Sequence, residues 1–160
     1  MDSRLAPLAE IFKLNTRLFA MALDGIDDEL GLLRQSDRGN SLGWVAGHAA
    51  SSRHVWAKLL GVNVDFPYPE RFERGTEPSE DLDYPSLADL AEAWQDISRK
   101  ALLAMEEAKL EILDAPAPFS TPSEDDSVLG ALAFFALHES YHVGEMAYVR
   151  KLLGFPSLVG

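Results

Sequence analysis

The chain has 160 residues, of which 47% are hydrophobic and 25% charged, and it contains no cysteine. Its 14 Lys and Arg residues against 26 Asp and Glu residues give a net charge of −12 at pH 7. This length suits one domain with a substantial core, so residues 1–160 are expected to form a single domain. The absence of cysteine excludes disulfides and thiolate chemistry from this sequence. The negative charge disfavours DNA and RNA as partners, because binding to a phosphate backbone requires basic patches.

The apolar segments are short relative to a membrane. No apolar stretch approaches the roughly 18 uncharged residues that a membrane-spanning helix needs, so no contact with a membrane is expected. The first five residues lack a basic region followed by an apolar core, which argues against a secretory signal. We therefore expect a cytoplasmic protein.

Two helices are predicted in the first part of the chain. Residues 3–23 form an amphipathic helix, because apolar residues recur at spacings of three and four. These positions are Leu5, Leu8, Ile11, Phe12, Leu18 and Phe19. A second helix is predicted over residues 41–60, with Ser41 as its N-cap and Gly61 as its stop. It is rich in glycine and alanine, which would let a neighbouring helix approach closely.

Two more helices are predicted after a long connection. Residues 62–85 are charged and proline-rich and are too long for a tight turn, so they are predicted to form a crossover connection or a lid. A third helix is predicted over residues 86–108, with a box-like pair of Ser86 and Asp89 at its start. After an irregular stretch over residues 114–126, the last helix is predicted over residues 127–153. Four long helices without strands predict an all-α four-helix bundle with longer crossover connections.

Three of the four histidines are predicted to point into this bundle. His138 and His142 lie four positions apart on the last helix, about one turn, so their imidazoles can converge on one metal ion. The angles of an ideal helix place this pair on an apolar face that also holds Phe134 and Phe135. His48 lies on an inward face of the second helix. His54 lies about 120° away from His48 and is expected outside the site.

A shared metal ion explains three inward histidines better than three separate core positions do. A lone buried histidine is more often hydrogen-bonded to a backbone carbonyl. Three rings without partners would each cost a few kcal/mol of desolvation. Imidazole ligation suits zinc, nickel, copper or iron(II) and disfavours magnesium and calcium. We predict that His48, His138 and His142 are the metal ligands, with zinc or nickel as the expected ion and iron or manganese as alternatives.

Glu145 is the candidate catalytic residue. It lies one turn beyond His142 on the same side of the last helix, where it could be a fourth ligand, a general base or a hydrogen-bond acceptor. A carboxylate that only bonds to a neighbouring helix is the alternative. Glu139 and Tyr141 lie to either side of the histidines, where either could orient a ligand or line the bundle surface.

The segment from His138 to His142 also satisfies the metalloprotease pattern H-E-x-x-H, in which Glu139 would be the general base. The longer pattern H-E-x-x-H-x-x-G-x-x-H fails, because position 145 is glutamate and position 148 is Tyr148. No strands are predicted that could flank a protease cleft. The protease interpretation is therefore disfavoured.

Two segments resemble motifs of a known family. Gly43-Trp44-Val45-Ala46-Gly47-His48 resembles the second-helix motif of the DinB-like superfamily, and His138-Glu139-Ser140-Tyr141-His142-Val143-Gly144-Glu145 resembles its signature on the last helix. The resemblance implies a four-helix bundle whose divalent metal is bound by His48, His138 and His142. Relatives often have glutamine at the position of Glu145. Several relatives are metal-dependent transferases or isomerases that use low-molecular-weight thiols, and others have no assigned activity.

These observations predict a metal-dependent enzyme that acts on a small molecule, either as a hydrolase or as a thiol-dependent transferase. In the second case a low-molecular-weight thiol would be the cosubstrate. The alternative is a non-catalytic stress-response or structural protein that the metal stabilises. A coordination position that opens on a cleft would favour catalysis. The sequence leaves the oligomeric state open, and a homodimer is possible.

Overall fold

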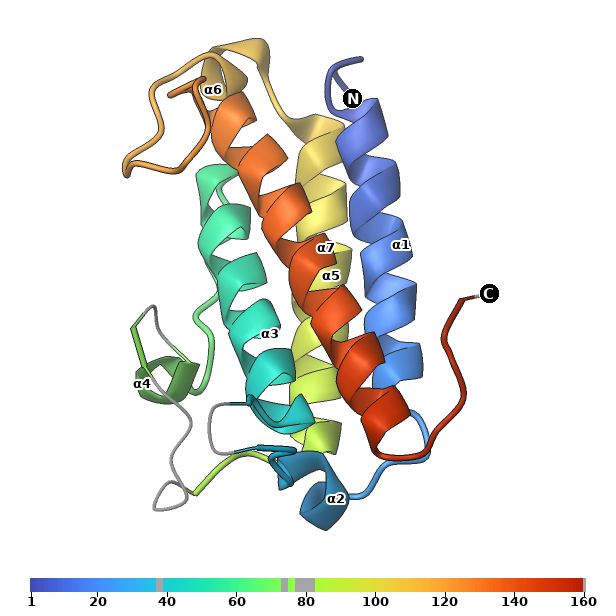
Figure 1. Cartoon of the computed structure of the whole chain (residues 1–160). Coiled ribbons are helices and arrows are strands. Elements are labelled where there is room, and N and C mark those ends of the chain that lie inside the picture. Colours follow the sequence, from blue (N-terminus) through green and yellow to red (C-terminus); the bar gives the residue numbers. More distant parts are fainter. Residues whose placement is uncertain (37–38, 73–74, 77–82, 160) are drawn as a thin grey trace.

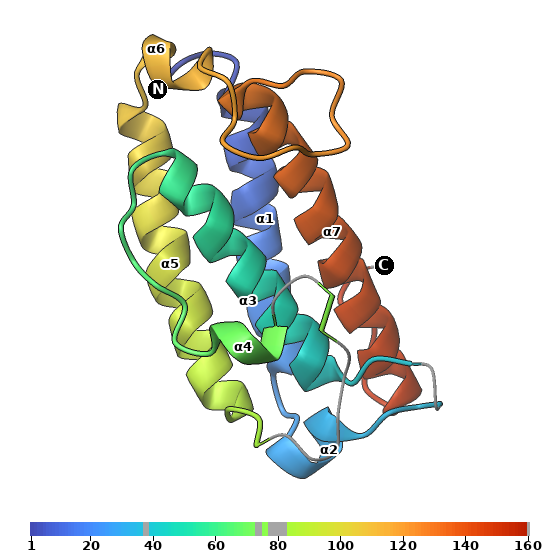
Figure 2. The same cartoon turned by 90° about the vertical axis from the view of Figure 1, so that its left-hand side faces the viewer.

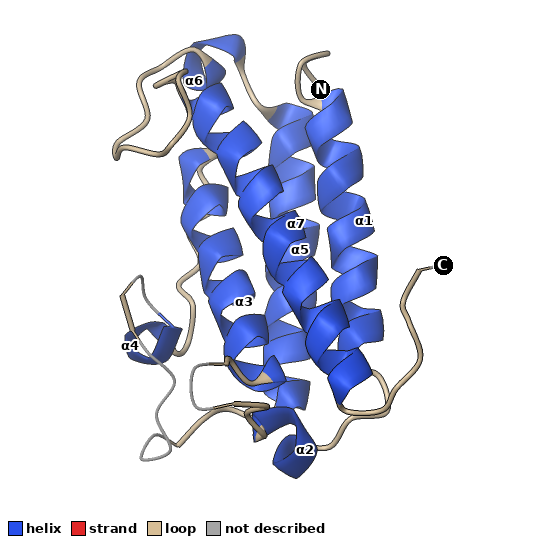
Figure 3. Cartoon of the chain, in the orientation of Figure 1, coloured by secondary structure: helices blue, strands red, loops and turns tan. Residues whose placement is uncertain are grey.

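The computed structural model describes residues 1–36, 39–72, 75–76 and 83–159, and four long helices run side by side through it (Figure 1). They are α1 (Ala6–Leu23), α3 (Leu42–Leu59), α5 (Leu87–Glu107) and α7 (Val128–Leu152). Helices α1 and α3 each pack against both α5 and α7. Within the described ranges the structure contains helices and no strand (Figure 3), so the all-α prediction is confirmed. None of these helices has the length and apolarity needed to cross a membrane.

The predicted starts of α3, α5 and α7 coincide with the observed caps, whereas α1 begins at Ala6, three residues later than predicted and without a side-chain cap. The Ser41 side chain accepts a hydrogen bond from the Trp44 amide, and the Ser127 side chain accepts one from the Gly130 amide. Ser86 and Asp89 form a complete capping box at the start of α5. Each cap satisfies backbone N–H groups that have no partner within the helix, so local sequence sets where these helices begin.

The described parts of the connections contain three short helices that periodicity does not reveal, α2 (Asp28–Leu32), α4 (Pro69–Phe72) and α6 (Leu110–Leu113). Helices α3 and α5 point in the same direction, and residues 60–72 return along the bundle as far as α4, which packs on α3 (Figure 2). The later proline-rich stretch instead lies at one end of the bundle (Figure 1). Within this stretch the backbone N–H of Ala117 donates a hydrogen bond to the carbonyl oxygen of Asp126 at 2.8 Å.

Aromatic side chains are among the largest in the bundle core. Phe12 stacks on Trp56 with ring centroids 4.3 Å apart, and Phe19 stacks on Trp94 at 4.1 Å. All three tryptophans, Trp44, Trp56 and Trp94, are buried. Of the apolar positions predicted for the first helix, Ile11 faces outward and is exposed.

A buried ion pair joins α3 to α7. The Arg53 side chain is fully buried and that of Glu139 is 2% exposed. Nε of Arg53 donates to Oε2 of Glu139 at 2.8 Å, and Nη2 donates to Oε1 of the same carboxylate. The helical angles suggested that Glu139 either orients a ligand or lines the bundle surface. In the structure it does neither, because it is buried and paired with Arg53. Its carboxylate is engaged by Arg53, which removes the base that the H-E-x-x-H interpretation requires.

The Arg53 guanidinium also contacts the other two long helices. Nη1 donates to the Thr16 hydroxyl of α1 at 2.6 Å and to the Ser98 hydroxyl of α5, and Nη2 donates to the Phe12 carbonyl at 3.2 Å. The guanidinium lies 3.6 Å from the ring centroid of Trp94. The side chain of this one residue of α3 thus contacts each of the other three long helices.

Arg150 of α7 also links two helices, because its side chain bonds the end of α1. Its Nη1 donates to the carbonyls of Asp24 at 2.6 Å and Ala22 at 3.3 Å, at the C-terminal end of α1. In the structure it bonds the terminal carbonyls of a neighbouring helix, which have no partner within that helix.

Breaking the buried pair is expected to destabilise the fold strongly. Arg53→Met leaves the Glu139 carboxylate buried without its partner, which should lower the free energy of unfolding by about 3–5 kcal/mol. Replacing both residues, as Arg53→Met with Glu139→Leu, should recover a large part of that loss because no unpaired charge remains. Urea unfolding followed by circular dichroism measures each value.

Lys58→Met is the control, because Lys58 pairs with Asp65 at 2.7 Å on the surface. Such exposed pairs contribute about 0–1 kcal/mol. Equal losses for Arg53→Met and Lys58→Met would show that the buried pair does not hold the bundle together.

Candidate metal centre

The fold brings the three predicted ligands together. His48 comes from α3, and His138 and His142 come from successive turns of α7. One ring nitrogen from each lies within 4.8 Å of the others, and no other group of three potential ligands occurs in the described ranges. The Nε2 atoms of His138 and His142 are 3.2 Å apart. His54 lies outside this cluster, as predicted, but it is buried, and its Nδ1 contacts the Ala50 carbonyl at 2.8 Å.

The position of His48 is set by its neighbours on α3 and α4. The Trp44 ring, one turn earlier, stacks parallel to the imidazole with centroids 5.2 Å apart. Gly47 leaves room for the Phe72 ring, since a Cβ atom there would lie 2.2 Å from that ring. The close approach of α4 places the Phe72 carbonyl oxygen 3.2 Å from Nδ1 of His48.

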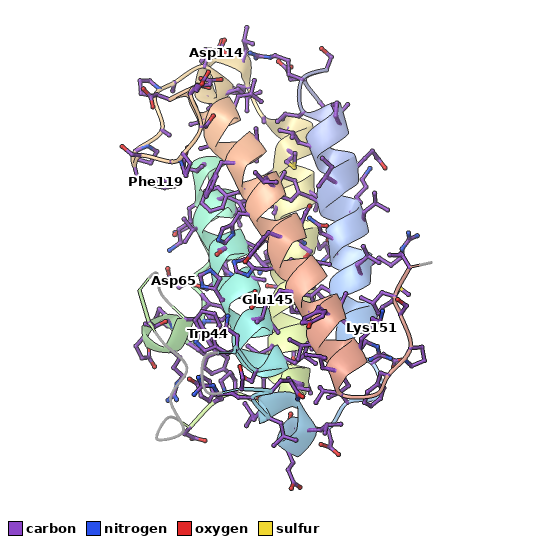
Figure 4. All side chains as sticks on the ribbon, viewed as in Figure 1. Trp44, Asp65, Asp114, Phe119, Glu145 and Lys151 are labelled. Carbon is purple, nitrogen blue, oxygen red and sulfur yellow. The ribbon has the colours of Figure 1, made fainter. Side chains whose placement is uncertain are left out.

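A carboxylate holds the His142 ring at Nδ1, the nitrogen that does not face His138. Nδ1 of His142 lies 3.1 Å from Oε2 of Glu145, one turn further along α7. The Asn40 amide donates to Oε1 of the same carboxylate at 2.9 Å. Figure 4 labels Glu145 on α7 and Trp44 on α3, the two helices that carry the site. Both Glu145 oxygens are therefore engaged, one by the histidine and one by the segment that precedes α3.

The hydrogen-bond partners of His48 and His142 fix which nitrogen of each of these two rings is free to bind a metal. A carbonyl oxygen and an ionised carboxylate can only accept hydrogen bonds, so Nδ1 of His48 and Nδ1 of His142 must donate. In the neutral rings the lone pair then lies on Nε2. Hydrogen bonds of this kind, from the second imidazole nitrogen to a carbonyl or carboxylate, are typical of metal-binding histidines.

The third ring, His138, lacks such a partner. Its Nδ1 is buried without a hydrogen bond, and its Nε2 faces Nε2 of His142. Two imidazole lone pairs at this separation repel each other unless a proton or a cation lies between them. A metal ion that accepts all three Nε2 lone pairs would resolve this contact, so the residues present fit a three-histidine site.

Burial favours the protonation states that metal binding needs. Desolvation, followed by the proximity of His142 and His48, lowers the pKa of His138 to about 4. Desolvation also lowers the pKa of His48. The hydrogen bond from His142 lowers the pKa of Glu145. At neutral pH, His48 and His138 are therefore neutral and Glu145 is ionised.

A pocket of about 710 Å³ adjoins the histidines, with His48 and His138 in its wall. Its apolar lining comes from α3, α4, α7 and the segment before α7, namely Trp44, Val55, Phe72, Phe119, Pro122, Phe134 and Phe135. Its polar lining consists of hydroxyl side chains, namely Ser51, Ser52, Thr76, Ser120 and Thr121. The volume lies in the range of about 300–1,000 Å³ that is typical of small-molecule sites.

Sequence reasoning missed two parts of the site. Asn40 lies in a connection, and Phe72 contributes a backbone carbonyl, so neither carries a recognisable ligand signature. The glycine at position 47 was the one available signal, because it indicated a close approach to α3.

Comparison with known proteins supports the family resemblance of the two motifs. A search of curated protein sequences found no match. The family model described as the DinB superfamily matches residues 11–146, which include all three histidines and Glu145. This match covers most of the chain. The protein therefore belongs to the DinB superfamily.

Proposed function

We propose that His48, His138 and His142 bind one divalent transition-metal ion and that the protein is a metal-dependent enzyme acting on a small molecule. The observation that carries this proposal is the pocket, because His48 and His138 form part of its wall. Three protein ligands leave at least one coordination position free, as in catalytic zinc sites. A molecule in the pocket can therefore approach the ion. This arrangement favours catalysis over a purely structural metal.

The all-imidazole ligand set supports zinc or nickel, with iron or manganese as alternatives. Glu145 is proposed to orient His142 and to keep its proton on Nδ1, because its oxygens face His142 and Asn40. Its predicted role as a general base would require one of these contacts to open.

Hydrolysis and thiol transfer are the two reactions proposed. A bound divalent ion supplies Lewis acidity, which polarises a carbonyl group or lowers the pKa of a thiol. The chain's own residues hold the ion and enclose the substrate. Because the sequence lacks cysteine, the thiol in a transfer reaction would arrive as a cosubstrate.

The metal ligands can be tested by substitution. Replacing His48, His138 or His142 with glutamine should each reduce bound zinc or nickel to well below one equivalent, as measured by elemental analysis after dialysis. His54→Gln is the control, since His54 is a buried histidine outside the cluster. Metal contents that are the same in all four variants would refute the ligand assignment.

The same variants test catalysis. Zinc- and nickel-loaded protein is assayed for hydrolysis of 4-nitrophenyl acetate and for transfer of glutathione to 1-chloro-2,4-dinitrobenzene. Turnover that is lost in His48→Gln and retained in His54→Gln supports the enzyme proposal. Metal that raises the thermal stability without any turnover in either assay would favour the non-catalytic alternative.

The lowered pKa of His138 predicts a pH dependence of stability in the metal-free protein. His138 has a pKa of about 4 in the folded chain, below the value of about 6.5 expected in the unfolded chain. Between these values the unfolded state binds more protons, so the free energy of unfolding should fall as the pH drops from about 7 to about 5. Urea unfolding at both pH values measures this change. His138→Gln should reduce the change, and an unaltered pH dependence in that variant would contradict this explanation.

Glu145→Gln separates orientation from base catalysis. If Glu145 orients His142, the variant should bind zinc roughly 10- to 100-fold more weakly, because glutamine is a poorer acceptor for the Nδ1 proton. Glu106→Gln, an exposed glutamate that changes the charge equally, should bind zinc as the wild type does. Unchanged affinity with turnover reduced by about 10²–10⁴-fold would instead assign Glu145 as a general base.

A further inference from the structure

The walls of the pocket beside the histidines are formed largely by aromatic rings from different elements. Trp44 of α3 stacks on His48 with an angle of 4° between the ring planes. On α7 the rings of Phe134 and Phe135 lie 5.4 Å apart and both contact His138, at centroid distances of 5.6 and 6.3 Å. Phe119, from the segment before α7, contacts Phe135 edge-on at 6.1 Å. Aromatic faces thus extend from the pocket to both of its histidines.

The described part of the pocket lining consists of uncharged residues. Among the described residues that line it there is no aspartate, glutamate, lysine or arginine, although a quarter of the chain is charged. Lys58 lies beside a neighbouring hollow of about 420 Å³ and is paired with Asp65. A charged group that entered the pocket would lose water without gaining an ionic partner, so uncharged ligands are favoured there. Hydroxyl groups such as Ser51 and Ser52 can still bond a neutral polar substituent.

We propose that the pocket binds an uncharged aromatic small molecule, which packs between the rings of α3 and α7 and presents a polar substituent to His48 and His138. The statement that this substituent reaches a metal rests on the proposed function. The class of molecule rests on the pocket alone. Aromatic side chains favour flat ligands because offset and edge-to-face contacts between rings add to the burial of apolar area.

Two fluorescent probes with the same ring system test this inference. N-phenyl-1-naphthylamine is uncharged, and 8-anilino-1-naphthalenesulfonate adds one sulfonate. Both are titrated into metal-free protein, so that the sulfonate has no metal ion to bind. The uncharged probe should bind at one site at least tenfold more tightly than the anion. Equal affinities, or no binding of the uncharged probe, would overturn the proposal.

Lysine substitutions locate the probe. Ser52→Lys places a cation in the pocket wall and should weaken the uncharged probe while strengthening the anion, which reverses the preference. Ser120→Lys, in an exposed segment of the lining, provides a second variant that should fold normally. Leu137→Lys is the control, because Leu137 is 70% exposed on the outer face of α7, away from the pocket lining. Loss of binding in Leu137→Lys alone would place the probe on that outer face and refute the proposal.

One further variant separates the two proposals. His142 is a proposed metal ligand that does not line the pocket, so His142→Gln should lose metal and still bind the uncharged probe. Probe binding without metal binding in the wild type would refute the metal centre and leave the pocket assignment standing. Metal binding without probe binding would refute only the inference about the ligand.

Discussion

The buried pair of Arg53 and Glu139 constrains how α3 and α7 lie against each other. Two parallel hydrogen bonds between a guanidinium and a carboxylate have a narrow geometry, and burial makes any unpaired arrangement cost several kcal/mol. Arg53 follows His48 by about a turn and a half on α3, and Glu139 directly follows His138 on α7. A shift of one helix along the other would therefore break the ion pair and also separate the histidines. The site depends on a register that a charge pair in the core helps to set.

The three histidines are held to different degrees. His48 is fixed by the Phe72 carbonyl and by stacking on Trp44, and His142 is fixed by Glu145, which Asn40 holds in turn. His138 has ring contacts but no hydrogen bond at Nδ1, and it lies in the pocket wall. Hydrogen bonds thus hold two of the three proposed ligands, and the pocket wall includes one of these two, His48, together with His138. The chain has a net charge of −12, yet none of the described residues that line the pocket is an aspartate, glutamate, lysine or arginine.

Much of this arrangement could be predicted from the sequence. Spacings of three and four residues locate the long helices, and serine caps give the starts of α3, α5 and α7, because both depend on local backbone chemistry. The inward faces of His48, His138 and His142 follow from helical angles. The role of Glu139 could not be derived, because its partner Arg53 is 86 residues away and only the packing of the helices brings them together. Asn40 lies in a loop, and Phe72 ends the short helix α4 within a connection. The spacing of apolar residues in long helices does not predict how such connections fold.

The atoms that surround a bound metal ion test the three-histidine centre most directly. X-ray absorption spectroscopy at the zinc edge, on protein loaded with one equivalent of zinc, reports these atoms without requiring an assay for activity. We expect three imidazole nitrogens at about 2.0–2.1 Å from the zinc ion, with the remaining position filled by a light atom that is not part of an imidazole. A coordination shell made of oxygen atoms alone would place the ion among surface carboxylates and would contradict the three-histidine centre.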